Sequence, residues 1–318
     1  MAEHQRISII VSSYDSARRS DIRALLFSLK RQERQNFELI TVVEQDMALV
    51  DIVSSYTTEF GLRPKIVVNE GPYGLSEARN LGAKEARGDF LAFVDDDVML
   101  MPQWTKAVED AFCTFQEIYG ITGPARPFWV EGEARWMPRE LDWLIGCTRW
   151  FRSDHVVLVR NCWGMNMAFR RAIFDSAGGF SNATGFHRGK LAEDLEFSLR
   201  IQGTGGGKIA YIPEMEVFNR VRSNRFEKSF LIERSSWIGH SRRSIRKLSS
   251  SQLDTSYESM ILGSTLLSLV RFDYLKGLRD LSDLVRLIQV TALVSVSLVL
   301  GYLLGPRLSS YKGQESAP

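Results

Sequence analysis

Four short apolar runs, separated by segments with helical periodicity, set the fold class of this chain. The segment Ile22–Lys30 places its apolar residues on one helical face. Helices are also predicted over Asp51–Phe60 and Leu75–Ala86. Alternation of this kind predicts an α/β fold, with a mostly parallel sheet between helices. The apolar runs, each read as a strand, are Ile7–Val11, Phe37–Val43, Lys65–Val68 and Phe90–Val94.

Polar or acidic residues follow three of these four strands. They are Ser12–Asp15, Glu44–Asp46 and Asp95–Asp97. In parallel sheets, ligands bind beyond the carboxyl ends of the strands. We therefore expect the three polar segments to meet at one edge of the sheet and to form a site there.

Three consecutive carboxylates end the last of these strands, in the stretch LAFVDDDV. Like charges side by side repel, and Asp is unfavourable in strands. Asp95 and Asp97 can share a hard cation, because Mg²⁺ is commonly held by one or two carboxylates together with substrate phosphates. Capping of the next helix is the alternative, but one Asp would be enough for that. The triplet therefore predicts a divalent metal and a phosphate-bearing ligand.

Beyond residue 100 the pattern is less regular, and one further acidic pair stands out. Glu193 and Asp194 open a predicted helix, Glu193–Arg200. A carboxylate there can act as a general base, or can complement the helix dipole. Arg79 could reach a diphosphate or a base, or could be a surface arginine. The other elements expected are a helix over Trp104–Ile118, strands over Val156–Val159, Met165–Phe169 and Ile209–Ile212, a loop over Ala177–Lys190 and a turn over Thr204–Lys208.

Composition narrows the function classes. The net charge of +2 gives no support to a nucleic-acid partner. The odd number of cysteines, without a CxxC pair, predicts buried thiols in a reducing compartment. The four histidines have no ligand spacing, which argues against a phosphatase or nucleotidyltransferase with a second metal. The cysteines are Cys113, Cys147 and Cys162.

The C-terminal part predicts attachment to a membrane. The segment Leu287–Leu304 carries no charge, and about 18 such residues can just span a bilayer. A buried amphipathic helix is the alternative. Residues 220–247 contain nine Lys and Arg, which suit an anionic lipid surface or a phosphate-bearing substrate, or form a solvated helix face. The first apolar run is too short for a signal peptide. We therefore expect a single-pass protein of the cell membrane with its catalytic domain in the cytoplasm.

Four motifs in order then point to a family. They are ISIIVSSYD, GLSEARNLGAKEARGDFLAFVDDDV, MNMAFRRAIFDSAGGF and AEDLEFSLRI. Over about residues 5–215 the chain resembles the family 2 glycosyltransferases, which have the GT-A fold. DWLIGC, RNCWGMNMAFRR, ERSSWIGHSRR and the C-terminal apolar span resemble the archaeal-type glucosyl-dolichyl phosphate glucuronosyltransferases. The predicted parts are a catalytic domain (1–215), a basic juxtamembrane region (216–283), a transmembrane helix (284–304) and a polar tail (305–318).

The resemblance implies roles for residues that match the family motifs. Asp97 would coordinate Mg²⁺ or Mn²⁺, and Asp95 would help to hold the metal or the ribose. Asp194, beside Glu193, matches the catalytic base. Arg234 and Trp237 lie near an Arg-Trp pair of related enzymes on the acceptor or diphosphate side. The full QxxRW motif is absent, which argues against a processive polysaccharide synthase. The remaining residues expected to bind the nucleotide sugar are Ser13, Tyr14, Glu44 (where the family usually has Asp), Arg79 and Asp96.

The implied activity is inverting transfer of a sugar from a nucleotide sugar, expected to be UDP-linked, with hexuronic acids among the candidates. The acceptor would be carried on a polyprenyl or dolichyl phosphate, in assembly of an N-glycan or a surface polysaccharide. Since a lipid phosphate is already largely ionised near neutral pH, an essential Asp194 would indicate a hydroxyl acceptor. The alternatives are transfer directly onto the lipid phosphate and a non-catalytic, membrane-tethered protein that binds nucleotides or sugars.

Overall fold

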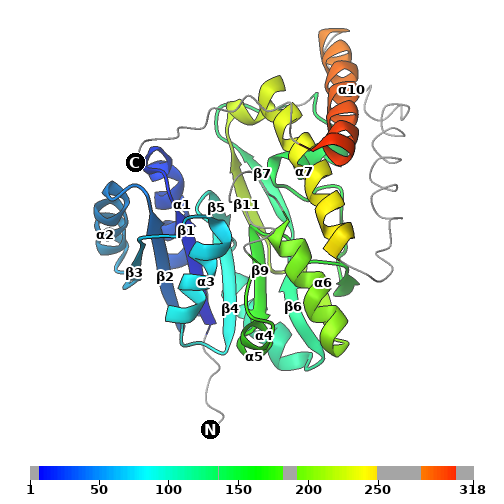
Figure 1. The fold of residues 1–318 in the computed structure, drawn as a ribbon. Coiled ribbons are helices and arrows are strands. Elements are labelled where there is room, and N and C mark those ends of the chain that lie inside the picture. The colour runs from blue at the N-terminus through cyan, green and yellow to red at the C-terminus, as the bar shows by residue number, and fades with distance from the viewer. Residues whose placement is uncertain (1–6, 135, 182–191, 249–280, 306–318) are drawn as a thin grey trace. The chain divides into compact units, whose positions relative to one another are not determined.

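The computed structural model describes residues 7–134, 136–181, 192–248 and 281–305 (Figure 1). The chain divides into two compact units. The first contains Met1–Gly132 and Ile145–Arg222, and the second contains Glu133–Leu144 and Ser223–Pro318. Most of the loop predicted over Ala177–Lys190, from residue 182 onward, lies outside the described residues.

An eight-stranded sheet forms the centre of the first unit, in the order β3-β2-β1-β4-β9-β6-β10-β8. The pairs among β1, β2, β3 and β4 are parallel, as is the β6–β10 pair. β9 runs antiparallel to both of its neighbours, and β8 runs antiparallel to β10. The sheet is therefore mixed, with the predicted parallel half intact. Its strands are β1 (Ile7–Ser13), β2 (Phe37–Glu44), β3 (Lys65–Asn69), β4 (Phe90–Asp95), β6 (Ile118–Thr122), β8 (Val157–Val159), β9 (Asn166–Arg170) and β10 (Lys208–Tyr211).

A smaller sheet continues from the carboxylate end of β4. Its order is β5-β11-β7, with β11 antiparallel to β5 and parallel to β7. The first residue of β5 follows Asp97 directly, so this sheet fixes the turn that carries the acidic triplet. The strands are β5 (Val98–Leu100), β7 (Ala125–Trp129) and β11 (Val217–Val221).

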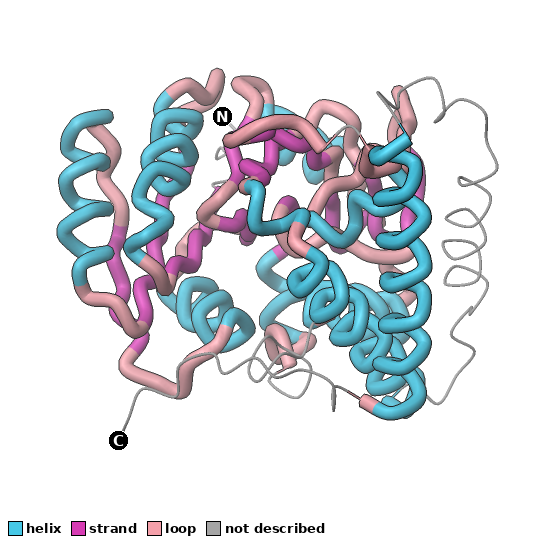
Figure 2. The backbone as a smooth tube through the Cα atoms, turned by 90° about the horizontal axis from the view of Figure 1, so that it is seen from above, coloured by secondary structure: helices cyan, strands magenta, loops and turns pink. Residues whose placement is uncertain are grey.

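Helices cover both faces of the large sheet (Figure 2). Ile9 packs with α1, α2 and α4, while the next residue, Ile10, packs with α3, α5 and α6 on the other face. Strands buried on both faces read as continuous apolar runs, which is the pattern of β1 and β4. The helices of this unit are α1 (Arg19–Lys30), α2 (Ala48–Phe60), α3 (Leu75–Glu85), α4 (Trp104–Thr114), α5 (Arg171–Ser176) and α6 (Glu193–Gly205), with the short 3₁₀ turn η1 (Ser16–Arg18). The 3₁₀ turn η2 (Arg139–Ile145) belongs, except for its last residue, to the second unit.

Three expectations from the sequence need correction. The helix predicted to reach Ile118 ends at Thr114, because Ile118 begins β6. The turn predicted over Thr204–Lys208 is shorter, since α6 continues to Gly205 and β10 begins at Lys208. Cys113 is exposed on the outward face of α4, whereas Cys147 and Cys162 are buried as expected.

The register of the parallel strands brings the polar segments to one edge, as predicted. Ser12 pairs with Asp95, and Ser13 pairs with Val43. On the far side of β2, Glu44 pairs with Asn69. The ends of β1, β2 and β4 are therefore neighbours, and the residues that follow them share one surface.

The second unit contains two long helices, α7 (Lys228–Leu248) and α10 (Leu281–Leu304), preceded by the 3₁₀ turn η4 (Ser223–Phe226). The two helices pack against each other. Gly239 faces the backbone of Leu298, and Gly301 faces the backbone of Ser236, so a Cβ at either glycine would collide with the other helix. Among the described residues, α10 is the one helix long and apolar enough to cross a membrane by length and composition.

Candidate active site

The three carboxylates that end β4 have different surroundings. The side chain of Asp95 is 36% exposed, that of Asp96 3% and that of Asp97 9%. The backbone N–H of Arg220, on β11, donates to the carbonyl oxygen of Asp97 at 2.8 Å. The small sheet therefore holds in place the turn that carries the triplet.

Asp96 joins the ends of β1 and β4. Its carboxylate accepts a hydrogen bond from the Ser13 hydroxyl at 2.6 Å and one from the Arg18 guanidinium at 2.7 Å. Burial raises the pKa of Asp96, and the charge of Arg18 and the Ser13 hydroxyl oppose that shift. Because the Ser13 hydroxyl and the Asp96 carboxylate are buried against each other, their observed contacts hold the strand ends together.

Arg18 also lies at the triplet, although no local sequence pattern marks it. It ends η1, which Asp15 caps by accepting from the N–H of Ala17 at 2.9 Å. The guanidinium lies 3.6 Å from the Asp97 carboxylate and 5.3 Å from the ring centroid of Tyr14, whose side chain is exposed. Burial alone would lower the pKa of Arg18, but the charges of Asp96 and Asp97 raise it overall. Arg18 therefore remains a cation beside the acidic triplet.

Arg79, on α3, connects the triplet to the second acidic pair. Its guanidinium donates to Asp95 at 2.8 Å, to Glu193 at 2.7 Å and to the carbonyl oxygen of Gly164 at 2.8 Å. The side chain is only 3% exposed. A planar guanidinium can serve three acceptors at once, which a lysine ammonium on a flexible stem does poorly. The buried guanidinium of Arg79 therefore links the two carboxylates through hydrogen bonds.

Glu193 and Asp194 begin α6 and differ in exposure. Burial raises the pKa of Glu193, with the positive charge of Arg79 opposing the shift. Asp194 is half-buried and accepts from the N–H of Gly164 at 2.9 Å. The residue before them, Ala192, has φ of 107°, a strained value for a residue with a Cβ. Asp194 is therefore the more accessible carboxylate of the pair, and it lies two residues after a strained backbone position.

Glu44 and Asp46 both hold loops near this edge. The Glu44 carboxylate is buried and accepts from the Asn69 amide at 2.8 Å and from the N–H of Gly74 at 3.3 Å. Asp46 is half-buried and accepts from the N–H of Ser16 at 2.9 Å, and hydrogen bonds from Ser16 lower its pKa. Glu44 therefore braces the loop before α3, while Asp46 connects the end of β2 to η1.

Two predicted site residues belong to the second unit. Arg234 and Trp237 are half-buried on α7, and the ring of Trp237 contacts that of His240 edge-on at 5.9 Å. Their predicted role on the acceptor or diphosphate side stays a prediction.

The donor atoms at the triplet fit a divalent metal that takes part of its coordination from a ligand. Asp95 and Asp97 supply the hard oxygens that Mg²⁺ and Mn²⁺ accept. Within the described ranges, no group of three or more His, Cys, Asp or Glu side chains could hold a metal. A metal held by these carboxylates would therefore complete its coordination with phosphate oxygens and water.

Comparison with known proteins identifies the family of this chain. Residues 8–178 match the family described as Glycosyl transferase family 2. A glucosyl-dolichyl phosphate glucuronosyltransferase of Haloferax volcanii is 28% identical over 242 residues, which cover 75% of this chain and 76% of that protein. An uncharacterized glycosyltransferase of Haemophilus influenzae is 30% identical over 196 residues, 61% of each chain.

Solved structures show the same fold at low sequence identity. The mannosyltransferase PcManGT from Pyrobaculum calidifontis, in complex with GDP-Man and Mn²⁺, superposes with a TM-score of 0.62 at 14% identity, over 95% of this chain and 88% of that one. GalNAc-T7 with UDP, GalNAc and Mn²⁺ gives a TM-score of 0.55 at 16% identity, over 83% of this chain and 55% of that one. The predicted GT-A-type fold is thereby confirmed.

Proposed function

Since this chain belongs to glycosyl transferase family 2 and is a glycosyltransferase, we propose that it transfers a sugar from a nucleotide sugar to an acceptor carried on a polyprenyl phosphate. The observation that carries the proposal is the buried guanidinium of Arg79, which bonds to Asp95 on one side and Glu193 on the other. That bond network ties the carboxylates proposed to hold the donor to the helix that presents Asp194.

A divalent cation, Mg²⁺ or Mn²⁺, is the proposed cofactor. Asp97 and Asp95 would hold it, and it would supply positive charge where the diphosphate leaves. The two similar structures contain Mn²⁺ together with a nucleotide or a nucleotide sugar, which supports this assignment. Arg18, 3.6 Å from Asp97, adds a second positive group to the same side of the site.

The nucleotide would lie over the ends of β1 and β2. Tyr14 offers an exposed ring there, while Ser13 and Asp96 would act by holding the strand ends that support it. Glu44 would act on the nucleotide base of the donor, either directly or through the loop that it holds in place. We propose a UDP-sugar donor, as the family resemblance implies, and hexuronic acids are included among the sugars because of the name of the Haloferax relative.

Asp194 is the proposed general base, with Glu193 as its buried neighbour. Its carboxylate would take the proton of an acceptor hydroxyl, which then attacks the anomeric carbon with inversion. A hydroxyl acceptor needs such a base, whereas a phosphate acceptor is already ionised. The name of the Haloferax relative describes a lipid-linked sugar acceptor, which supports a hydroxyl. Transfer directly onto the lipid phosphate is the second candidate, and Arg234 and Trp237 are proposed on the acceptor or diphosphate side in either case.

The proposed place of action is the cytoplasmic face of the cell membrane, with α10 as the attachment. The length and apolar composition of α10 support the attachment. The basic residues of α7 suit an anionic lipid surface.

A donor and acceptor panel tests the activity. Membranes that contain the protein are incubated with UDP- and GDP-sugars and with either a polyprenyl phosphate or its glucosyl derivative, and the lipid product is identified by its mass. We expect a product from a UDP-sugar and the glucosyl lipid. Asp97→Asn and Asp194→Asn should each abolish it, while Asp175→Asn, an exposed carboxylate on α5, should not. Transfer from GDP-sugars alone would refute the donor, and transfer that persists in Asp194→Asn would refute the base.

A further inference from the structure

The helix α10 has two apolar faces. One face packs inside the second unit and includes Leu287, Val290 and Val294. The other face is open: Ile288, Val296 and Leu303 are 52%, 56% and 56% exposed, and the stripe continues with Leu281, Val285 and Val299. These positions follow helical spacing over six turns. An open apolar stripe of this length on a surface helix marks a site of contact with a partner or a lipid.

The buried face of α10 packs against α7, and both helices run in the same direction. Lys228, at the start of α7, donates to Gln289 at 3.1 Å. Arg243, near the other end of α7, donates to the carbonyl oxygens of Tyr302 and Leu303 at the end of α10. Between these points, Gly239 and Gly301 allow the backbones to meet. Much of α10 is therefore paired with α7 through close backbone contacts.

This pairing conflicts with a spanning position for α10. A helix that crosses the bilayer would carry its packed neighbour with it. The paired part of α7 contains Glu233, Arg234, His240, Arg242 and Arg243. Ionisable side chains in the hydrocarbon core are costly, and an isolated apolar helix of the same length would avoid that cost. The charge pattern of α7 suits the boundary between lipid and water instead.

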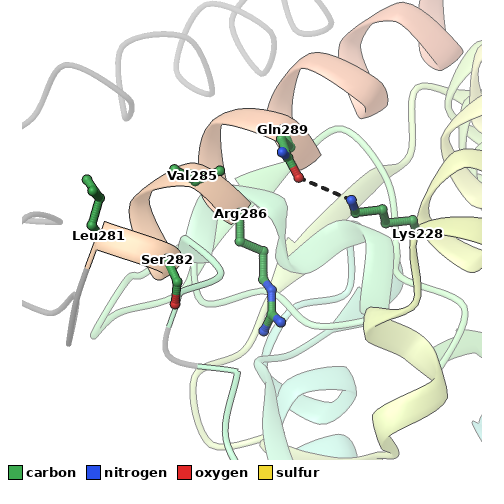
Figure 3. Close-up of a pocket in the computed structure, with 6 residues that line it drawn as sticks. All are labelled: Lys228, Leu281, Ser282, Val285, Arg286 and Gln289. Atoms are coloured by element: carbon green, nitrogen blue, oxygen red, sulfur yellow. Dashed lines mark hydrogen bonds between the residues drawn. The ribbon is translucent and has the colours of Figure 1, made fainter.

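The polar groups at the start of the helix pair support the same position. A hollow of about 520 Å³ lies there, lined by Lys228, Arg286 and Gln289 together with Ser282, Leu281 and Val285. Figure 3 shows that the side chains of Arg286 and Leu281 extend from opposite sides of α10. Two cations beside an apolar stripe match the order of groups at an anionic membrane surface, where phosphates lie above acyl chains.

We propose that α7 and α10 lie together in the plane of an anionic membrane surface, with the open stripe of α10 in the acyl boundary, and that α10 does not cross the bilayer. The inference rests on the membrane attachment proposed above, but not on the donor, the acceptor or the reaction. Its tests measure position and binding, so a failure of the proposed reaction leaves them unaffected.

Labelling of single cysteines distinguishes the two positions. Ser282→Cys and Ser310→Cys are each made in a Cys113→Ser background, because the remaining cysteines are buried. Inside-out membrane vesicles are treated with a membrane-impermeant maleimide before and after detergent. We expect both cysteines to react before detergent, as the native Cys113 does in the unaltered chain. Protection of either cysteine until detergent is added would show that α10 crosses, and would overturn the proposal.

Binding to vesicles tests the lipid as occupant of the stripe. Purified protein is floated with vesicles of phosphatidylglycerol and phosphatidylcholine, or of phosphatidylcholine alone. We expect Val296→Asp to bind at least tenfold more weakly than the unaltered chain, and Ser229→Asp, an exposed position at the start of α7, to bind within twofold. Binding should also weaken without the anionic lipid. Unchanged binding of Val296→Asp would overturn the proposal. Sedimentation that shows two copies of the chain held together through the stripe would also overturn it.

Discussion

Arg79 is the residue on which the geometry of the two acidic groups depends. Its buried guanidinium serves Asp95, Glu193 and the carbonyl oxygen of Gly164. In Arg79→Lys the charge is kept, but one ammonium cannot reach three acceptors placed for a planar fork. We expect the free energy of unfolding to fall by about 2–4 kcal/mol and sugar transfer to slow by about 100-fold.

The matched control for this prediction is Arg87→Lys, an exposed arginine just beyond α3. Denaturant unfolding and initial transfer rates are measured for both variants. Arg87→Lys should match the unaltered chain in both. If Arg79→Lys also kept its activity, the hydrogen bonds of Arg79 to Asp95 and Glu193 would not be needed for sugar transfer.

Arg18 gives a second prediction at the same scale. Its charge offsets part of the repulsion within the triplet, because it lies 2.7 Å from Asp96 and 3.6 Å from Asp97. In Arg18→Met, the carboxylates lose this cation. We expect a lower unfolding temperature without metal and a larger increase on addition of Mn²⁺ than in the unaltered chain, since a bound cation then relieves more repulsion. Thermal unfolding with and without Mn²⁺ measures both effects.

The exposed neighbour Arg19→Met is the comparison, and it should respond to Mn²⁺ as the unaltered chain does. Equal responses in Arg18→Met and Arg19→Met would show that the charge of Arg18 does not affect the carboxylates proposed to hold the metal.

Local pattern identified some site residues and missed others for a physical reason. Asp95, Asp97, Glu193 and Asp194 stand out because carboxylates occur next to one another where a strand ends or a predicted helix begins. Arg18 could not be found in this way, because its partner Asp96 is 78 residues away in the sequence. The contact between Arg79 and the Gly164 carbonyl, 85 residues apart, has the same origin.

At the scale of elements, α3 must lie close to the sheet for Arg79 to reach its partners. Gly82 makes this approach possible, because a Cβ there would collide with the side chain of Ile10 on β1. We expect Gly82→Ala to lower the free energy of unfolding by about 1–3 kcal/mol and to reduce transfer as α3 shifts.

Gly203→Ala on α6 is the opposite case, since a Cβ there would meet nothing within 4 Å. It should raise the free energy of unfolding by about 0.5–1 kcal/mol, because alanine loses less backbone entropy in a helix. Denaturant unfolding of both variants measures these changes in the free energy of unfolding. A loss of stability in Gly203→Ala as large as in Gly82→Ala would contradict the explanation by close packing.

The elements that the sequence predicted well are those with a local signal. The parallel half of the sheet follows from apolar runs alternating with helical periodicity, and its register then places the polar segments together. The antiparallel direction of β9 has no such signal, because it depends on the path of the chain between β7 and β9. The end of α4 was misplaced for a related reason, since Phe115–Ile118 is compatible with helix until β6 pairs with β10 and β9.

At the scale of the whole molecule, the two units separate the proposed chemistry from the proposed membrane attachment. The acidic groups belong to the first unit, and the apolar stripe of α10 belongs to the second. The sequence placed both features along the chain. It could not show that α7 and α10 are paired, because that pairing depends on glycines that meet only in the folded helices.

The unfolding temperature of the whole molecule should show how the binding of the metal and the binding of the nucleotide depend on each other. Two carboxylates give a divalent cation few protein ligands, and the described residues offer no group of three. Phosphate oxygens would supply the rest, so each ligand should bind weakly alone and tightly with the other.

We expect UDP with Mn²⁺ to raise the unfolding temperature by about 5–10 °C, corresponding to about 2.7 kcal/mol at 100 times the Kd, and either alone to raise it by much less. Thermal unfolding in the four combinations of UDP and Mn²⁺ measures this, with Asp97→Asn as the variant that should lose the joint effect and Asp175→Asn as the one that should keep it. Additive effects of the two ligands would mean that they bind apart, and the metal would then have no place in holding the donor.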